Sequence, residues 1–352
     1  MEAIEVGAHT IGPDSPPFIV AEISANHNQS FERALKLIDA AKAAGAHAVK
    51  FQTYTPDTIT IDIQEGEFFI SDPNNLWKGK SLYQLYQEAY TPWEWHETLF
   101  KRCKEQNLIA FSTPFDATAV DLLESLGVPC YKIASLEITD LPLIKKAAST
   151  GKPLFISTGT ATLEEIDEAV TEARSAGCRQ LILLKCTSAY PAPANQMNLR
   201  TLPHLSDTFH SLVGLSDHTL GIGAAIASIP LGACLIEKHF TLARSDGGVD
   251  SAFSLEPAEF AELVCETKRA WEAIGSVHYG PTAAEKTLRS LRRSLYFVKD
   301  IKAGDKITEE HIRAIRPGNG LPPKEYSRLI GRYVNSDIKR GEATHWDQLR
   351  PL

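Results

Sequence analysis

The sequence predicts an α/β protein in which a (β/α)8 TIM barrel is followed by a small β-rich domain. Over the first 275 residues, short β-rich runs alternate with amphipathic helical segments. There are eight such runs, which is the number of strands that closes a barrel of this kind. Each run is apolar almost throughout, as expected of parallel strands that are buried on both faces.

The expected elements follow one another in a regular order. The strands are expected at residues 18–24, 47–53, 108–115, 131–135, 153–158, 180–188, 210–217 and 234–240. Between the first two runs, residues 31–45 ("FERALKLIDAAKAAG") predict a helix. The apolar positions on one face of this helix are Ala34, Leu37, Ile38 and Ala41. Another helix is expected to begin at "TPWE", with Thr91 as its cap and Pro92 in the first turn. An open doubly wound sheet is the alternative, but no glycine-rich turn follows the first strand.

The connections and turns divide the chain into regions. The longest connection, residues 54–90, follows the second expected strand and is expected to cover or contact a substrate. We expect a catalytic barrel at residues 1–275, a linker at 276–292 and the small domain at 293–352. In the small domain, glycine-containing turns separate short strand-like runs.

Composition excludes several classes of protein. The net charge of −8 argues against a general nucleic-acid surface. No apolar stretch approaches the length of a membrane span, and the first residues do not resemble a secretory signal. The six cysteines are scattered and form no CxxC pair, so we expect buried reduced thiols in a cytoplasmic protein.

Polar side chains gather at the carboxyl ends of all eight expected strands, where barrels of this class carry their active sites. They include Glu22, Ser24, Asn26, His27, Lys50, Gln52, Ser112, Thr113, Lys132, Ser135, Ser157, Thr158, Lys185, Thr187, Ser188, Ser216, Asp217, His218, Glu237, Lys238 and His239. Burying so many polar groups is costly unless they are paired or bind a ligand. The pattern therefore predicts a binding site at this end of the barrel.

Two kinds of chemistry are expected there. Lysines among serine and threonine hydroxyls suit a phosphate or carboxylate, although Lys50 or Lys132 could instead form a structural ion pair. His218 and His239 end neighbouring strands and suit a divalent metal such as Mn²⁺, with Mg²⁺ or Co²⁺ as alternatives. A hydrogen-bonded pair of histidines is the other interpretation.

Several motifs give the chain a recognisable resemblance. They are "AEISANHNQSFERALKLIDAAKAAGAHAVKFQTYTPDT", "FSTPFD", "YKIAS", "STGTAT", "LKCTSAYPAP", "GLSDHT" and "IEKHF". Together they resemble the sialic acid synthase family of nonulosonic acid synthases. The tail "RSLYFVKDIKAGDKITEEHIRAIRPGNGLPP" is similar to the antifreeze-like (SAF) domain of that family, which is of the β-clip type. The resemblance covers nearly the whole chain.

Family members condense phosphoenolpyruvate with an open-chain amino sugar and release phosphate by C–O cleavage. Two segments, "LWKGKSLYQLYQEAYTPWEWH" and "KHFTLARSDGGVDSAFSLEPAEF", are most similar to the pseudaminic acid synthase branch. That similarity implies 2,4-diacetamido-2,4,6-trideoxy-altropyranose as the sugar. The alternative is a manno-configured amino sugar, as used for N-acetylneuraminate or legionaminate.

The resemblance also implies roles for individual residues. Phosphoenolpyruvate would be held by Lys50, Thr113, Lys132, Ser135, Ser157, Ser188 and Ser216. The sugar would be contacted by Gln52, Tyr190, Asp250 and Arg316. Glu22 would act at the reacting centre, with His218 and His239 as catalytic metal ligands. The implied assembly is a homodimer in which the small domain reaches the partner's active site.

Two rival functions remain. A non-catalytic carbohydrate- or ice-binding protein is one, but the charged residues of the small domain do not suit an ice surface. Another phosphoenolpyruvate-dependent aldolase or keto-acid phosphate synthase is the other, and such an enzyme would not require the tail.

Overall fold

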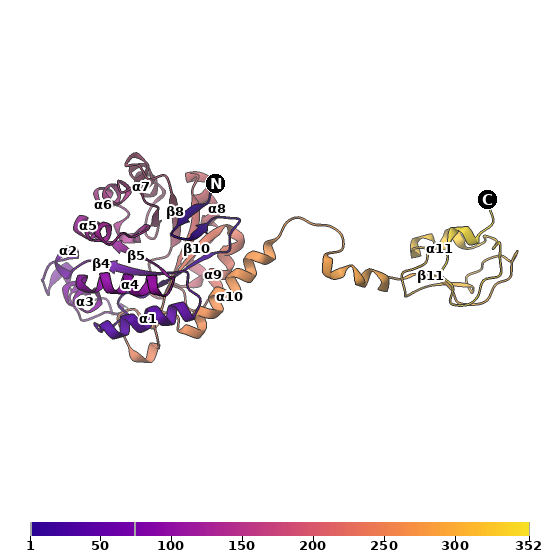
Figure 1. Cartoon of the computed structure of the whole chain (residues 1–352), viewed down its shortest axis with the longest axis horizontal. Helices are drawn as coiled ribbons and strands as arrows, with labels where there is room; N and C mark the ends of the chain where they lie inside the picture. The colour runs from indigo at the N-terminus through magenta and orange to yellow at the C-terminus, as the bar shows by residue number, and fades with distance from the viewer. Residues whose placement is uncertain (1, 74, 352) are drawn as a thin grey trace. The chain divides into compact units, whose positions relative to one another are not determined.

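A computed structural model describes residues 2–73 and 75–351 of the chain (Figure 1). The chain divides after Gly275 into two compact units, residues 1–275 and residues 276–352. We describe each unit by itself.

The first unit is a closed barrel of parallel strands surrounded by helices (Figure 1). The strands are β3 (Phe18–Glu22), β4 (Ala48–Thr53), β5 (Ile109–Pro114), β6 (Tyr131–Ile133), β7 (Leu154–Ser157), β8 (Leu181–Cys186), β9 (Leu212–Asp217) and β10 (Ala233–His239). Each strand pairs with the next one along the chain, and β10 pairs with β3 to close the barrel. The predicted (β/α)8 barrel is confirmed, and closure excludes the open sheet.

The helices lie between the strands. The principal ones are α1 (Phe31–Ala43), α4 (His96–Glu105), α5 (Ala117–Ser125), α6 (Leu141–Ala148), α7 (Leu163–Ser175), α8 (Thr201–Phe209), α9 (Gly223–Ser228) and α10 (Pro257–Ile274). The long connection after β4 contains two shorter helices, α2 (Pro56–Ile59) and α3 (Leu82–Ala89). The four apolar positions predicted to face inward from α1 are all buried.

The predicted start of the helix at "TPWE" is wrong. A 3₁₀ turn at Trp93–Trp95 comes before α4. Pro92, not Thr91, is the cap residue of this turn. The Thr91 hydroxyl is buried and lies 3.2 Å from Nε2 of His27. A tertiary partner has therefore taken the side chain that the local pattern assigned to a cap.

Alternation along the strands determines which side chains fill the barrel, because successive residues point to opposite faces. One inward layer consists of Val20, Ala48, Phe111, Cys130, Phe155, Leu184, Gly214 and Leu235. Two residues further along every strand, the inward layer is polar: Glu22, Lys50, Thr113, Lys132, Ser157, Cys186, Ser216 and Glu237. The intervening positions, such as Ile19 and Val49, belong to the apolar core packed against the helices. The barrel therefore changes from apolar to polar within one repeat of each strand.

A β-hairpin closes the opposite end of the barrel. Strands β1 (Ile4–Val6) and β2 (His9–Ile11) pair in antiparallel register. Their side chains Ile4, Val6 and Ile11 are buried in one cluster with the apolar interior of the barrel. The sequence analysis expected no strands in this segment.

The second unit has its own small core. Strands β11 (Ser294–Phe297) and β12 (Ile312–Ile315) pair in antiparallel register, and a short helix α11 (Tyr326–Leu329) follows. The core consists of Leu295, Phe297, Ile301, Ile307, Ile312, Leu329, Val334, Ile338 and Leu349. Before β11, short 3₁₀ turns at Ala283–Glu285 and Thr287–Leu291 occupy the region expected to be a linker.

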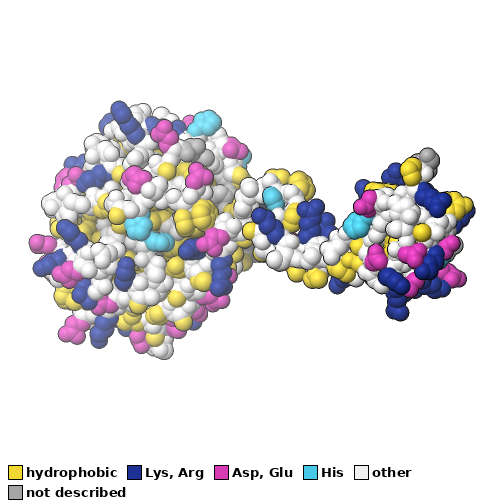
Figure 2. Space-filling model, turned by 45° about the vertical axis from the view of Figure 1, so that its right-hand side comes forward, with side chains coloured by type: hydrophobic (Ala, Val, Ile, Leu, Met, Phe, Trp, Pro, Cys, Tyr) yellow, Lys and Arg dark blue, Asp and Glu magenta, His cyan; other side chains and the backbone are white. Residues whose placement is uncertain are grey.

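On the face of the first unit seen in Figure 2, acidic and basic side chains are interspersed. Among the residues that the structure describes, no helix is both long enough and apolar enough to cross a bilayer.

Candidate functional site

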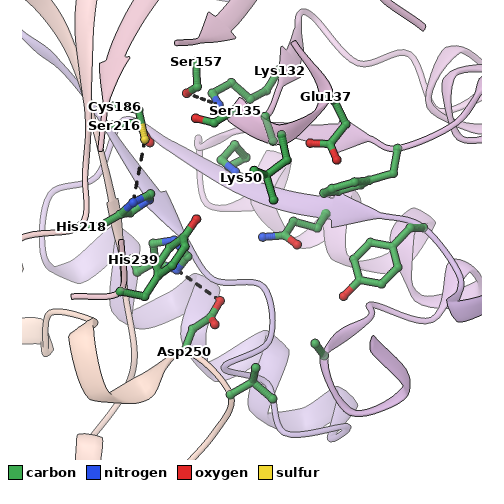
Figure 3. A pocket seen from close by; sticks show the side chains of 18 of the residues that line it. Lys50, Lys132, Ser135, Glu137, Ser157, Cys186, Ser216, His218, His239 and Asp250 are labelled. Atoms are coloured by element: carbon green, nitrogen blue, oxygen red, sulfur yellow. Dashed lines mark hydrogen bonds and ion pairs between the residues drawn. The ribbon is translucent and has the colours of Figure 1, made fainter. Parts of the chain in front are cut away.

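A cavity of about 200 Å³ lies at the carboxyl end of the barrel strands. Ten of the predicted site residues line it: Lys50, Gln52, Lys132, Ser135, Ser157, Tyr190, Ser216, His218, His239 and Asp250. Thr113 and Glu22 lie behind this lining layer, where both contact Lys50. Ser188 lies beside the lining residue Cys186. Arg316 belongs to the second unit and is exposed. The barrel thus brings together nearly all of the predicted residues (Figure 3).

Lys50 is paired with carboxylates. Its Nζ forms an ion pair with Glu22 Oε2 and lies 3.5 Å from Glu237 Oε1. All three side chains are buried. Burial alone would lower the pKa of Lys50, but the two carboxylates outweigh it and raise the pKa. The structural ion pair considered for Lys50 is therefore present, and this lysine is held in its charged form.

Lys132 has a different environment. Its Nζ donates to Ser157 Oγ at 2.6 Å and to the Ile133 carbonyl at 3.2 Å. Within residues 2–73 and 75–351 it forms no ion pair with a carboxylate. Burial lowers its pKa, Glu237 opposes this effect and Lys50 adds to it. A buried amine with only neutral partners is a cation that an anionic ligand would stabilise.

Hydroxyl groups converge beside Lys132, and a glycine permits their approach. The Gly159 backbone N–H donates to Ser135 Oγ at 3.1 Å. A Cβ atom at Gly159 would lie 2.2 Å from Ser188 Oγ and 2.6 Å from Ser135 Oγ, so any other residue there would force these serine side chains to move. The sequence analysis did not single out Gly159. Its position after β7, in "STGTAT", places a backbone donor between two serine hydroxyls, a suitable arrangement for anionic oxygens.

His218 and His239 lie side by side across the cavity from this group (Figure 3). Their ring centroids are 5.3 Å apart. Nδ1 of His218 lies 3.1 Å from the Thr187 carbonyl, which can only accept, so Nδ1 carries a hydrogen and Nε2 is left free. Nδ1 of His239 lies 3.4 Å from Asp250 Oδ2 and has no hydrogen-bond partner within the described residues.

Two imidazoles side by side are the kind of nitrogen ligands that Mn²⁺ and its neighbours take. The hydrogen bond from His218 to a carbonyl is the usual way in which a ligating histidine is oriented. In the described part of the chain, no third His, Cys, Asp or Glu completes a metal-binding cluster. Water and substrate would therefore have to complete the coordination.

Aromatic rings support the two histidines. The Tyr190 ring lies 4.4 Å from that of His218, and the Phe253 ring lies 5.0 Å from that of His239. Tyr190 and Phe253 also pack on each other at 5.1 Å. Phe253 is fully buried and was not predicted, because an aromatic residue in a loop carries no distinctive sequence signal.

Two carboxyl groups on the cavity wall have raised pKa values. Burial, with a smaller contribution from Glu22, raises the pKa of Asp250 to about 7. Burial also raises the pKa of Glu137 to about 7, although Lys132 opposes the shift. The sequence analysis named Asp250 but missed Glu137, which follows Ser135 by two residues and lies on the opposite side of the cavity from the histidines (Figure 3). The motif "SLE" after β6 could have indicated it.

Asp217 and Lys238 do not belong to the cavity. Each stands one residue before a site histidine, so each points out of the barrel instead of into it. Lys238 Nζ forms a buried ion pair with Asp217 Oδ2 at 2.8 Å and donates to the Thr219 carbonyl at 2.6 Å. The two charged residues at these strand ends therefore join β9 and β10 to the loop that follows β9.

Comparison with known proteins identifies the chain. A model of the NeuB family matches residues 37–279, and a model of the SAF domain matches residues 292–350. The chain belongs to the NeuB family. The resemblance to sialic acid synthases is thereby confirmed, as is the prediction of an enzyme.

Three relatives place the chain within the NeuB family. The pseudaminic acid synthase of Helicobacter pylori is 44% identical over 327 residues, which cover 92% of this chain and 95% of the relative. The N,N'-diacetyllegionaminic acid synthase of Campylobacter jejuni is 37% identical over 328 residues, covering 92% and 97%. A crystal structure of N-acetylneuraminic acid synthetase from Leptospira borgpetersenii, in complex with citrate, has a TM-score of 0.73 and 33% identity, covering 82% of this chain and 95% of that one.

The buried ion pair gives a prediction about stability. Lys238→Met should lower the free energy of unfolding by about 3–5 kcal/mol, because Asp217 would be left buried and unpaired. The double variant Asp217→Asn with Lys238→Met should recover most of that loss, as measured by urea denaturation. Lys268→Met is the control, since Lys268 forms only an exposed pair with Glu272. A loss in Lys238→Met no larger than in the control would contradict the assignment.

Proposed function

We propose that this NeuB-family protein is a pseudaminic acid synthase. It condenses phosphoenolpyruvate with 2,4-diacetamido-2,4,6-trideoxy-altropyranose in its open-chain form. The observation that carries the proposal is the similarity to the Helicobacter pylori pseudaminic acid synthase over nearly the whole of both chains. The lower identity to a legionaminic acid synthase makes that activity the second candidate.

Phosphoenolpyruvate is held at the floor of the cavity. Lys132 is the buried cation without a carboxylate partner, and Ser135, Ser157 and the Gly159 N–H surround it. An anion bound there restores the full charge of Lys132, whose pKa burial has lowered. Lys50, Thr113, Ser188 and Ser216 complete the site from neighbouring strands.

The sugar lies toward the loops, where Gln52, Tyr190 and Asp250 line the cavity. Its aldehyde faces the floor, because the new carbon–carbon bond forms with C3 of phosphoenolpyruvate. That bond gives C2 oxocarbenium character, and a water molecule then adds to C2. The bond between C2 and the phosphate oxygen then breaks, so the products are the nonulosonic acid and inorganic phosphate.

The residues of the chain act on this sequence through position and charge. Lys50 and Lys132 stabilise the negative charge of the departing phosphate. Glu22 lies beside Lys50, just behind the cavity lining, and we assign its carboxylate the role of accepting a proton from the attacking water. His218 and His239 would hold a divalent ion, with Mn²⁺ preferred over Mg²⁺ or Co²⁺. Such an ion would supply an electrophile for the sugar aldehyde oxygen.

The second unit completes the sugar site of a partner chain in a homodimer. Its loop at residues 316–320 is fixed, because Gly320 N–H donates to Ser294 Oγ at 2.9 Å and a Cβ at Gly320 would lie 2.2 Å from the Leu295 carbonyl. Arg316, at the base of this loop, is exposed and has no ion-pair partner within the described residues. Its guanidinium can form two parallel hydrogen bonds to a sugar oxygen or acyl group.

The choice of sugar is the direct test of the function. Incubation with phosphoenolpyruvate and the diacetamido trideoxy-altrose should give pseudaminic acid, identified by mass and by comparison with an authentic sample. N-acetylmannosamine and the legionaminate precursor should be poor substrates, because specificity resides in how the cavity receives the acetamido and methyl groups. A comparable kcat/KM for the legionaminate precursor would contradict the pseudaminate assignment and leave the family intact.

Metal removal should abolish activity. A chelator-treated preparation should be inactive, and Mn²⁺, Co²⁺ or Mg²⁺ should restore it, because the two imidazoles are the protein ligands. His218→Ala and His239→Ala should prevent restoration and lose Mn²⁺ binding in equilibrium dialysis. His204→Ala, on the exposed face of α8, is the control and should behave as wild type. Full turnover by the metal-free enzyme would rule the ion out.

Exchange between subunits can be tested by complementation. Arg316→Ala and Lys132→Ala proteins should each be inactive, because each lacks one part of every site. Mixing them should restore about a quarter of wild-type activity, since half of the dimers are mixed and each rebuilds one of two sites. If mixed dimers form, as shown by differently tagged chains, but remain inactive, the second unit does not act on its partner's site.

A further inference from the structure

An exposed segment after β4 carries one half-buried tryptophan. Phe69 and Ser81 form an isolated β-bridge at the base of the segment. Of the described residues from 71 to 79, all are exposed except Trp77, which is half-buried. A segment of this kind has little apolar contact of its own to order it. The Trp77 indole is therefore one anchor of the segment, beside the backbone hydrogen bonds of Ile70 with Gly79 and Lys80 and the ion pair between Lys80 and Glu88.

Trp77 connects two loops at the carboxyl end of the barrel. Its indole N–H donates to the Val249 carbonyl at 2.9 Å, and its ring lies 5.9 Å from that of Tyr190. Val249 directly precedes Asp250, which faces His239 at 3.4 Å. The hydrogen bond thus ties the connection after β4 to the residue next to a carboxyl group of the site.

Trp77 also separates two hollows. Together with Val249 it lines both the 200 Å³ cavity of the site and a neighbouring cleft of about 490 Å³. The neighbouring cleft has a mixed lining, with polar residues such as Asn28, Gln29 and Lys78 beside apolar ones. The indole is therefore a partition between the site and the outer cleft.

The same connection supplies much of the apolar lining of the cavity. Ile59, Leu85 and Ala89 come from α2 and α3, and Val249, Ala134 and Leu136 add aliphatic groups from other loops. The two buried lysines of the cavity, Lys50 and Lys132, lie on barrel strands instead. A flat aromatic ring offers a large contact surface at low cost in side-chain entropy, which suits the carbon chain of a sugar but not a phosphate.

We propose that Trp77 is a sugar-contacting residue that pins the segment Phe69–Ser81 over the site and forms the wall against which the sugar packs. This rests on the proposed function only in that an amino sugar is the ligand on this side of the cavity.

Steady-state kinetics separate the two substrates. Trp77→Ala should raise the KM for the sugar by about tenfold or more and change the KM for phosphoenolpyruvate by less than about twofold. Trp77→Phe keeps a ring but loses the hydrogen bond to Val249, so its effect on the sugar KM should be smaller. Phe69→Ala, an aromatic truncation in the same segment outside both hollows, is the control and should leave both KM values unchanged.

Limited trypsin digestion reports on the segment itself. Lys78 and Lys80 offer cleavage sites within it. The sugar should slow cleavage there in the wild type, because the bound sugar packs under Trp77. In Trp77→Ala, cleavage should be faster and independent of the sugar. A purely structural tryptophan would give faster cleavage in the variant, but no protection of the wild type by the sugar and no change in the sugar KM.

The outcomes distinguish this inference from the proposed function. If the wild type makes pseudaminic acid and the Trp77 variants keep the sugar KM, the inference is wrong and the function stands. If the wild type instead uses the legionaminate precursor or N-acetylmannosamine, the pseudaminate assignment is wrong. The same KM and digestion comparisons with that sugar then decide the role of Trp77. Trp77→Phe, which keeps the bulk of the side chain, provides the test if Trp77→Ala does not fold.

Discussion

The site depends on a difference between two buried lysines: Lys50 has carboxylate partners and Lys132 has none within the described part of the chain. Glu22 and Glu237 neutralise Lys50, whereas Lys132 has only a hydroxyl and a carbonyl as partners. If carboxylates neutralised both lysines, no buried positive charge would remain to attract an anion. Because Lys132 has no ion-pair partner among the described residues, binding of an anionic substrate beside it is electrostatically favourable.

Strand alternation places these groups, and it explains why the sequence was informative. The eight polar inward positions each follow an apolar inward position by two residues, so the pattern was legible in the sequence once the strands were located. The same rule separates the histidines from their neighbours. Lys238 and Asp217 looked like site residues because they are charged and end strands, but alternation turns them outward to each other.

Other features had no local signal. Thr91 stands in a sequence typical of a helix cap, yet its hydroxyl forms a hydrogen bond with His27. Only the folded barrel brings these two residues together. Gly159 matters because two serine hydroxyls from other strands approach it, and Phe253 matters because it packs on His239. These positions depend on distances between segments far apart in the chain, which neither periodicity nor motif spacing encodes.

The hairpin at the amino end has a consequence for how the chain is made. Residues 4–11 are synthesised before the barrel strands, but their apolar side chains are buried against the interior of a barrel that β10 closes only at residue 239. During translation the apolar face of the hairpin stays exposed until the last strand, β10, has been made. Such contacts of high sequence separation slow folding and leave intermediates prone to aggregation. The first unit should therefore acquire its native core only after the ribosome has released β10, and chaperone demand should be greatest in that interval.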